Sequence, residues 1–143
     1  MRKAIAIVVL IFAVVGSFSF TSMVLDRTPP ITYEGARALQ ASVRRGEAID
    51  VEFKVFRTRI CPIVAKRWLI DAEGVKHSIP SYTVGLQLLA GRETYQRSIT
   101  IPQSAALGHA WYEVSLSYYC NFLHKIGWPI TVTSPPIEFT VAE

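Results

Sequence analysis

The first 25 residues constrain the chain more than any other feature, because they combine a basic start with a long uncharged stretch. Arg2 and Lys3 precede Ala4–Leu25, a run of 22 residues without a charged side chain. As an α-helix this run spans about 33 Å at roughly 1.5 Å per residue, enough to cross a hydrocarbon core of about 30 Å. The positive-inside bias keeps both basic residues in the cytoplasm. We therefore expect a single-pass signal anchor in the cytoplasmic (inner) membrane, with a periplasmic or extracellular C-terminal domain.

A cleaved signal peptide is the alternative interpretation of the same segment. The basic start, the 12-residue apolar stretch Ala4–Val15 and the small residues Ser17 and Ser19 fit its general pattern. However, no Ala-x-Ala sequence is present, and apolar residues return from Phe20. Both interpretations export the rest of the chain, so the alternative product is a secreted binding domain.

The composition excludes several classes of protein. Hydrophobic residues make up 50% of the chain and charged residues 18%, which excludes a disordered tail. The net charge is +4, and the chain without Arg2 and Lys3 keeps 13 basic and 11 acidic residues, a net charge of +2. We therefore expect no nucleic-acid partner.

One segment, 44–67, is locally basic. It is either a solvated sheet face or a surface for anionic lipid headgroups or an acidic partner. The residues assigned to this basic face are Arg57, Arg59, Lys66 and Arg67.

Strand signals dominate after the Thr28-Pro29-Pro30 stop. The clearest is the alternation of Ile49, Val51, Phe53 and Val55 with polar residues, a period of two that is typical of a half-buried strand. We expect about seven short strands in an antiparallel β-sandwich. The expected units are the anchor at 1–25, a linker with a first strand or helical turn at 26–47, and the sandwich at 48–143. The expected strands are Ala48–Ile60, Ile63–Asp71, Val75–Ile79, Tyr82–Leu89, Glu93–Ile101, Gly108–Asn121 and a last strand at Ile130–Val132 and Ile137–Val141, broken by Pro135 and Pro136.

The two cysteines sharpen this prediction, because an exported, oxidising setting favours a Cys61–Cys120 disulfide. The segment Ala105–Cys120, with Tyr118 two residues before Cys120 and Trp68 seven residues after Cys61, resembles the end of an immunoglobulin-like or fibronectin-like domain. The resemblance implies an immunoglobulin-like sandwich with the disulfide between its two sheets. It carries no functional residues over, because the Cys-to-Trp gap is short and no Asp-x-Gly precedes Tyr118. In layout the chain also resembles small anchored envelope proteins of bacteria and their phages.

No catalytic pattern is present in the sequence. It contains no Gly-x-Ser-x-Gly elbow, no Ser-x-x-Lys pair and no phosphate-binding glycine loop, so we expect neither an enzyme nor a cofactor, and we identify no small-molecule substrate. The Cys120-x3-His124 spacing resembles the copper loop of cupredoxins, which gives the alternative of an exported metal or redox carrier. Its ligand candidates are His77, His109, Cys120 and His124. The simpler expectation is a structural disulfide beside a solvent-facing His124.

Aromatic and basic residues cluster near the end of the predicted domain. They either fill the core or project as a partner-binding or membrane-interface loop. Trp111 is out of phase with the buried positions of its strand and is a further interface candidate. The sequence favours a non-catalytic, membrane-anchored binding or assembly module, an accessory subunit of an envelope or phage–host membrane complex with a protein partner. The partner-binding candidates are Trp111, Phe122, His124, Lys125 and Trp128.

Overall fold

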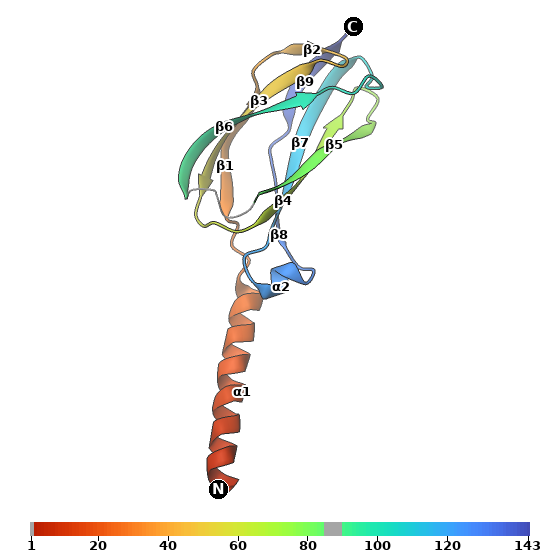
Figure 1. Cartoon of the computed structure of the whole chain (residues 1–143). Coiled ribbons are helices and arrows are strands. Elements are labelled where there is room, and N and C mark those ends of the chain that lie inside the picture. Colours follow the sequence, from red (N-terminus) through yellow and green to blue (C-terminus); the bar gives the residue numbers. More distant parts are fainter. Residues whose placement is uncertain (1, 85–89) are drawn as a thin grey trace.

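A long N-terminal helix extends away from a β-domain (Figure 1). The computed structural model describes residues 2–84 and 90–143. Helix α1 (Arg2–Leu25) has 24 residues, none of them buried, and is long and apolar enough to cross a membrane. A signal sequence near the N-terminus passes the same test of length and composition.

Nine strands form two sheets in the described part of the chain. The three-stranded sheet has the order β1 (Ile31–Ala38), β3 (Ala48–Arg57) and β6 (Gly91–Thr100). The six-stranded sheet has the order β2 (Ser42–Arg44), β9 (Ile137–Ala142), β7 (Gly108–Tyr118), β4 (Ile63–Ile70) and β5 (Lys76–Val84), and β8 (Ile130–Thr133) pairs with β7 outside that order. All the strand pairs are antiparallel except β2 with β9.

The core lies between the two sheets and follows the alternation of the sequence. In β3 the inward side chains of Ile49, Val51, Phe53 and Val55 are fully or almost fully buried, as the period of two predicts. In β7 the inward set runs from Ala110 through to Tyr118. The expectations of a β-rich domain behind an apolar helix are therefore confirmed.

The arrangement differs from the expected seven-stranded sandwich. The segment 26–47 contains two strands, β1 and β2, and no helix. The two prolines at 135 and 136 separate β8 from β9, which pair with different parts of β7. The two sheets curl around the core as a half-barrel (Figure 1). Of the expected strand Tyr82–Leu89, residues 85–89 lie outside the described part.

The disulfide forms between the predicted partners but joins different places from those of an immunoglobulin-like domain. Cys61 is bonded to Cys120, just before β4 and just after β7. These strands are neighbours in the six-stranded sheet, with Ile63 opposite Tyr118. The bond therefore closes one end of a single sheet and does not bridge two sheets. Trp68 points to the outer face of that sheet, where the Lys76 ammonium lies 3.9 Å from its ring centroid.

Candidate membrane-proximal site

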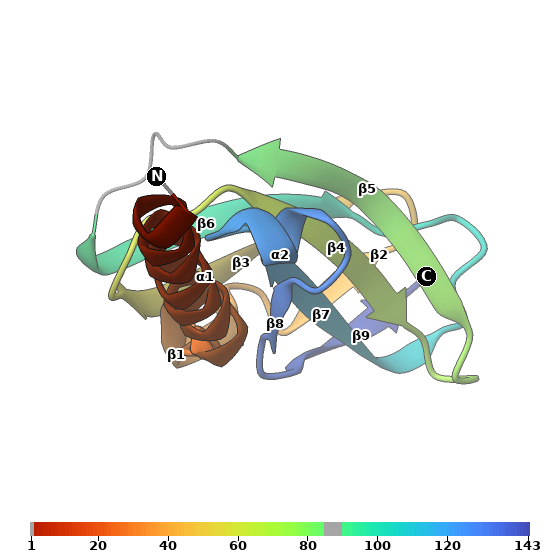
Figure 2. The same ribbon diagram turned by 90° about the horizontal axis from the view of Figure 1, so that it is seen from below.

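The end of α1 contacts the domain through a one-turn helix, α2 (Phe122–Lys125) (Figures 1 and 2). This helix lies in the connection from β7 to β8, directly after Cys120. The chain therefore brings residues about 100 positions apart together at the base of the domain. We call this region, with the linker 26–30, the junction.

Asn121 joins α2 to α1. As the N-cap of α2, its side-chain Oδ1 accepts the backbone N–H of His124 at 3.1 Å, which is the usual role of Asn before a helix. Its Nδ2 donates to the carbonyl of Met23 at 3.2 Å and to the carboxylate of Asp26 at 3.3 Å. One side chain thus starts the short helix and binds the last turn of the long one.

His124 is fully buried, which corrects the expectation that it faces solvent and binds a partner. Its Nδ1 accepts the backbone N–H of Cys120 at 3.2 Å, and its Nε2 lies 3.1 Å from the carbonyl oxygen of Asp26. These two contacts fit the neutral imidazole with its proton on Nε2, which then donates to Asp26. His124 is therefore a structural link between the disulfide and the linker.

Two arginines hold the linker from its sides. Arg59 pairs with Asp26 at 2.6 Å and donates to the Thr28 carbonyl at 2.7 Å. Arg27 donates to the Trp128 carbonyl at 2.9 Å, and its guanidinium lies 4.5 Å from the Trp128 ring centroid. One hydrogen bond contributes about 0.5–1.5 kcal/mol net to the free energy of unfolding. Several together therefore hold in place a segment that the sequence predicts to be an extended linker.

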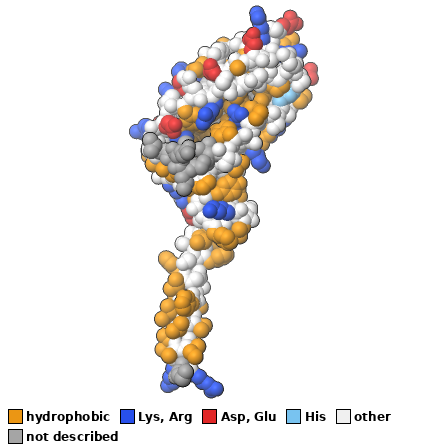
Figure 3. Space-filling model, viewed as in Figure 1, with side chains coloured by type: hydrophobic (Ala, Val, Ile, Leu, Met, Phe, Trp, Pro, Cys, Tyr) orange, Lys and Arg blue, Asp and Glu red, His pale blue; other side chains and the backbone are white. Residues whose placement is uncertain are grey.

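Apolar side chains surround the junction on the outside. Phe122 is 63% exposed, Ile126 64% and Trp128 48%, and Lys125 is exposed beside them. We call these four residues the foot. Figure 3 shows apolar side chains continuing from the helix onto this base of the domain. Aromatic and basic side chains together are favoured at membrane–water interfaces, and exposed apolar groups of this size mark interaction surfaces.

A hollow of about 350 Å³ lies between the foot and the disulfide. Its lining includes Ile60, Tyr119, both bonded cysteines and, from the foot, Phe122 and Lys125. The foot therefore borders a hollow and is continuous with the end of α1.

The structure separates the other predicted site residues. Trp111 lies half-buried on the outer face of the six-stranded sheet, opposite Ile70 and Glu138. It is near the start of β7, whereas the foot follows the end of that strand. The four residues of the expected basic face do not share one surface. Arg57 is buried between the sheets, Arg59 binds the linker, Lys66 is exposed on the outer sheet face, and Arg67 donates to the Pro80 carbonyl.

The four candidate metal ligands also lie apart. The Cys120 sulfur is bonded to Cys61, and His124 is enclosed at the junction. At the other end of the domain, His77 Nε2 lies 2.7 Å from Asp71 and His109 Nε2 3.6 Å from Glu138. Within residues 2–84 and 90–143, no three His, Cys, Asp or Glu side chains gather as a metal site would require.

The distal end of the domain is organised by Asp71, a second buried polar residue that sequence reasoning did not single out. Its carboxylate accepts backbone N–H groups of Glu73, Val75 and Ala106 at 2.9–3.1 Å, besides the contact with His77. Burial alone would raise its pKa, but the bonds from Ala106, His77, Val75 and Glu73 together hold the pKa of Asp71 well below its ordinary value. The carboxylate therefore closes the β4–β5 turn, where Gly74 supplies the expected positive φ of 77°.

Sequence reasoning also missed Asp26, Arg27 and Asn121 at the junction. The available signals were weak but physical. Asn121 precedes a short run of helix-compatible residues, as an N-cap does, and Asp26 is the first acidic residue after the apolar helix. Their pairing across 95 positions has no sequence signature.

Comparison with known proteins adds only general likenesses. No family model matches the chain, and no curated protein matches it. The alkylpurine DNA glycosylase AlkC of Pseudomonas fluorescens, solved with DNA containing an abasic site analog, matches 86% of this chain and 33% of its own at 14% identity and a TM-score of 0.49. A Niemann-Pick type C2 protein of the Japanese carpenter ant matches 78% of this chain and 96% of its own, at 12% identity and a TM-score of 0.45. The sporulation control protein Spo0M of Bacillus subtilis matches 81% of this chain and 51% of its own, at 13% identity and a TM-score of 0.35.

The chain spans a third of the length of the glycosylase. At these identities and TM-scores, the likenesses carry no argument about function.

Proposed function

We propose that this chain is a non-catalytic, membrane-anchored binding or assembly module, an accessory subunit of an envelope or phage–host membrane complex. Helix α1 is its anchor in the inner membrane, and the β-domain stands on the periplasmic or extracellular side. In this proposal the domain works through its loops and faces. The observation that carries the proposal is the junction, which fastens the β-domain to the last turn of α1.

The junction favours an anchor over a removable signal peptide. Asn121 binds the carbonyl of Met23 within α1, and His124 and Arg59 bind Asp26 directly after it. A helix that is discarded gains nothing from contacts between its last turn and the folded domain. A retained helix gains a fixed orientation for the domain above the membrane.

The foot supplies the contact surface in this proposal. Since α1 ends at Leu25, its neighbours Phe122, Ile126 and Trp128 lie at the level where the hydrocarbon core gives way to headgroups. Lys125 adds a positive charge at the same level, which suits anionic headgroups. A partner with its own membrane segment meets α1 and the foot as one continuous surface.

Native mass spectrometry of the full chain, extracted in mild detergent from the membranes of its own cell, tests this proposal. We expect the intact chain with residues 1–25 present, lighter by the two hydrogens lost to the disulfide, and with other chains attached. The double substitution Phe122→Ala and Trp128→Ala should release those chains. A matched control is Val75→Ala with Leu107→Ala, which trims two exposed apolar side chains, 48% and 39% exposed, at the distal end.

Two outcomes would contradict the proposal. A chain that begins near Phe20 and is recovered outside the membrane makes the protein a secreted domain. Attached chains that survive the foot substitutions but leave with the distal ones place the binding surface at the other end.

A further inference from the structure

The two sheets meet on one side without hydrogen-bonded strands. Strands β5 and β6 are the edges of their sheets there, and neither pairs with the other. Arginine and tyrosine side chains from both sheets close this side in an alternating stack. From one sheet to the other the stack runs Arg67, Tyr82, Arg97, Tyr95 and Arg57, and successive guanidinium-to-ring-centroid distances are 5.3, 5.3, 5.5 and 5.7 Å.

The three arginines of this stack are not equally satisfied. Arg57 is paired with the carboxylate of Glu93, and Arg67 donates to the carbonyl of Pro80. Arg97 makes no hydrogen bond or ion pair with any residue in the described part of the chain. Its guanidinium lies against the faces of two tyrosine rings.

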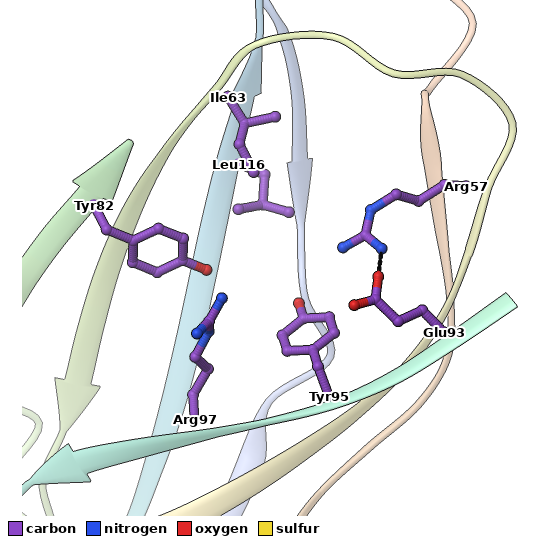
Figure 4. A pocket seen from close by; sticks show the side chains of 7 residues that line it. All are labelled: Arg57, Ile63, Tyr82, Glu93, Tyr95, Arg97 and Leu116. Carbon is purple, nitrogen blue, oxygen red and sulfur yellow. Dashed lines mark hydrogen bonds and ion pairs between the residues drawn. The ribbon is translucent and has the colours of Figure 1, made fainter. Parts of the chain in front are cut away.

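A small cavity opens beside the stack, between the two sheets. Its volume is about 30 Å³, and Ile63 and Leu116 form its apolar wall. The guanidinium groups of Arg57 and Arg97 and the hydroxyls of two tyrosines point into it from the other sides (Figure 4). Arg57 is only 6% exposed, and its buried Nε–H has no partner in the described structure.

The charge of this cavity is positive. The guanidinium groups of Arg57 and Arg97 line the cavity with the single carboxylate of Glu93, a net charge of +1. Residues 85–89 contain no acidic side chain, so they add no counter-charge. The cavity is therefore lined by the guanidinium of Arg97, which has no carboxylate partner among the described residues, and by Arg57, whose Nε–H is unpaired.

The two tyrosine hydroxyls of the cavity are suited to donate to an anion. Burial, and then the neighbouring Tyr82, raise the pKa of Tyr95 well above its ordinary value. Its hydroxyl therefore keeps its proton at physiological pH. Neither the hydroxyl of Tyr82 nor that of Tyr95 has a hydrogen-bond partner within the described residues, so both are free to donate.

We propose that this inter-sheet cavity binds one carboxylate group, held by the fork of Arg97 with donors from Arg57, Tyr82 and Tyr95. About 10–15 Å³ accommodates one water-sized group, so the cavity takes about two, the number of oxygens in a carboxylate. The four oxygens of a phosphate exceed that space. Arginine forks bind planar carboxylates through two parallel hydrogen bonds. The ligand enters from the solvent side, where Arg97 and Glu93 are exposed.

Arginine Nε–Hε resonances report binding directly. The full chain, labelled with ¹⁵N-arginine in zwitterionic detergent micelles, is titrated with sodium acetate while sodium chloride keeps the ionic strength constant. We expect the resonances of Arg57 and Arg97 to shift and saturate. In Arg97→Gln the Arg57 resonance should need about tenfold more acetate, the equivalent of one lost charge-assisted bond.

Arg92→Gln is the matched control, since Arg92 lies on the same strand but pairs with Glu34 outside the cavity. Its titration should match that of the unsubstituted chain. Arg97→Lys keeps the charge and removes the planar pair of donors, so it should also weaken binding. It replaces Arg97→Gln as the test if that variant does not fold.

A shift that never saturates, or that is unchanged in the Arg97 variants, overturns the proposal. Saturation by inorganic phosphate but not by acetate overturns the assignment of a carboxylate.

Discussion

The two ends of the β-domain each enclose a buried polar side chain, but they connect it to different parts of the chain. At the distal end Asp71 receives three of its four hydrogen bonds from residues two to six positions later. At the proximal end, which contacts α1, His124 and Asn121 bind residues 95 to 98 positions earlier. The distal hydrogen bonds close the β4–β5 turn, whereas the proximal ones attach the β-domain to α1 and the linker. Similar polar chemistry therefore stabilises a turn of the fold at one end and the attachment of α1 at the other.

The two ends of the β-domain also differ in their exposed apolar side chains. Around Asp71 the large exposed apolar side chains are the aliphatic Val75 and Leu107, whereas the foot presents Phe122, Ile126 and Trp128. The proximal end is also the one that carries the disulfide. The disulfide, the cap of α2 and the contacts of the linker therefore lie together at the end of the domain that α1 contacts.

Removal of the disulfide should have the largest effect. The double substitution Cys61→Ser and Cys120→Ser opens a loop with a sequence separation of 59 residues. Chain-entropy arguments put its contribution to the free energy of unfolding at about 4 kcal/mol. Urea unfolding followed by near-ultraviolet circular dichroism measures it. A loss well below 1 kcal/mol would mean that hydrogen bonds alone hold the proximal end.

Asp71→Asn should destabilise the distal end by about 2–3 kcal/mol, because it weakens several bonds to a buried charge. Since the folded-state pKa of Asp71 is lowered, its contribution is present above the ordinary value of 3.8 and is lost as pH falls below it. The unsubstituted chain should therefore lose stability more steeply than the variant between pH 5 and pH 2. Parallel acid profiles for the two proteins would show that Asp71 is not the group that titrates.

His124→Ala should cost about 2 kcal/mol by leaving a cavity and unpaired groups on Cys120 and Asp26. Its specific consequence is a loosened linker, which exposes the peptide bond after Arg27 to trypsin. Limited proteolysis read by mass spectrometry should show faster cleavage there than in the unsubstituted chain. Asp71→Asn serves as the control, because it destabilises the domain at the other end. Equal acceleration in both variants would mean that cleavage follows global unfolding.

The foot substitutions Phe122→Ala and Trp128→Ala should have the smallest effect on stability, about 1 kcal/mol, because Phe122 is largely exposed and the half-exposed Trp128 loses its ring contact with Arg27. Their effect should fall on membrane contact. Vesicles that contain the full chain should show weaker protection of the linker from trypsin with this pair than with Val75→Ala and Leu107→Ala. Equal protection would assign the contact to α1 alone.

The sequence predicted most of what hydrophobic periodicity controls. The apolar helix, the alternation in β3 and β7 and the cysteine pair are all confirmed. The helix and the alternation depend on local pattern, and the sequence contains two cysteines, which leaves one pairing. Arg57 was predictable too, since it shares the inward parity of Val55 and so belongs to the cavity side. The expectation of an exposed basic face gives more weight to its charge than to its inward position in the alternation.

The rest depends on contacts between distant residues. Nothing local to His124 says that Asp26 covers it, and its spacing from Cys120 resembles a metal loop just as well. Trp68 follows Cys61 in the next strand, as the core tryptophan of an immunoglobulin-like domain does after a longer gap, but the pairing of β4 with β7 turns it outward. The strand topology decides whether such side chains are buried or exposed, and a single sequence does not specify that topology.

The depth of Trp128 in the membrane tests the central claim most directly. A full chain with Trp68→Phe and Trp111→Phe keeps Trp128 as its one tryptophan. It is placed in vesicles whose lipids carry bromine at known depths. The account predicts strong quenching by bromine near the headgroups and weak quenching by bromine at the bilayer centre. Fluorescence that no brominated lipid quenches, with α1 inserted, would show that the foot stands clear of the membrane and would contradict the account.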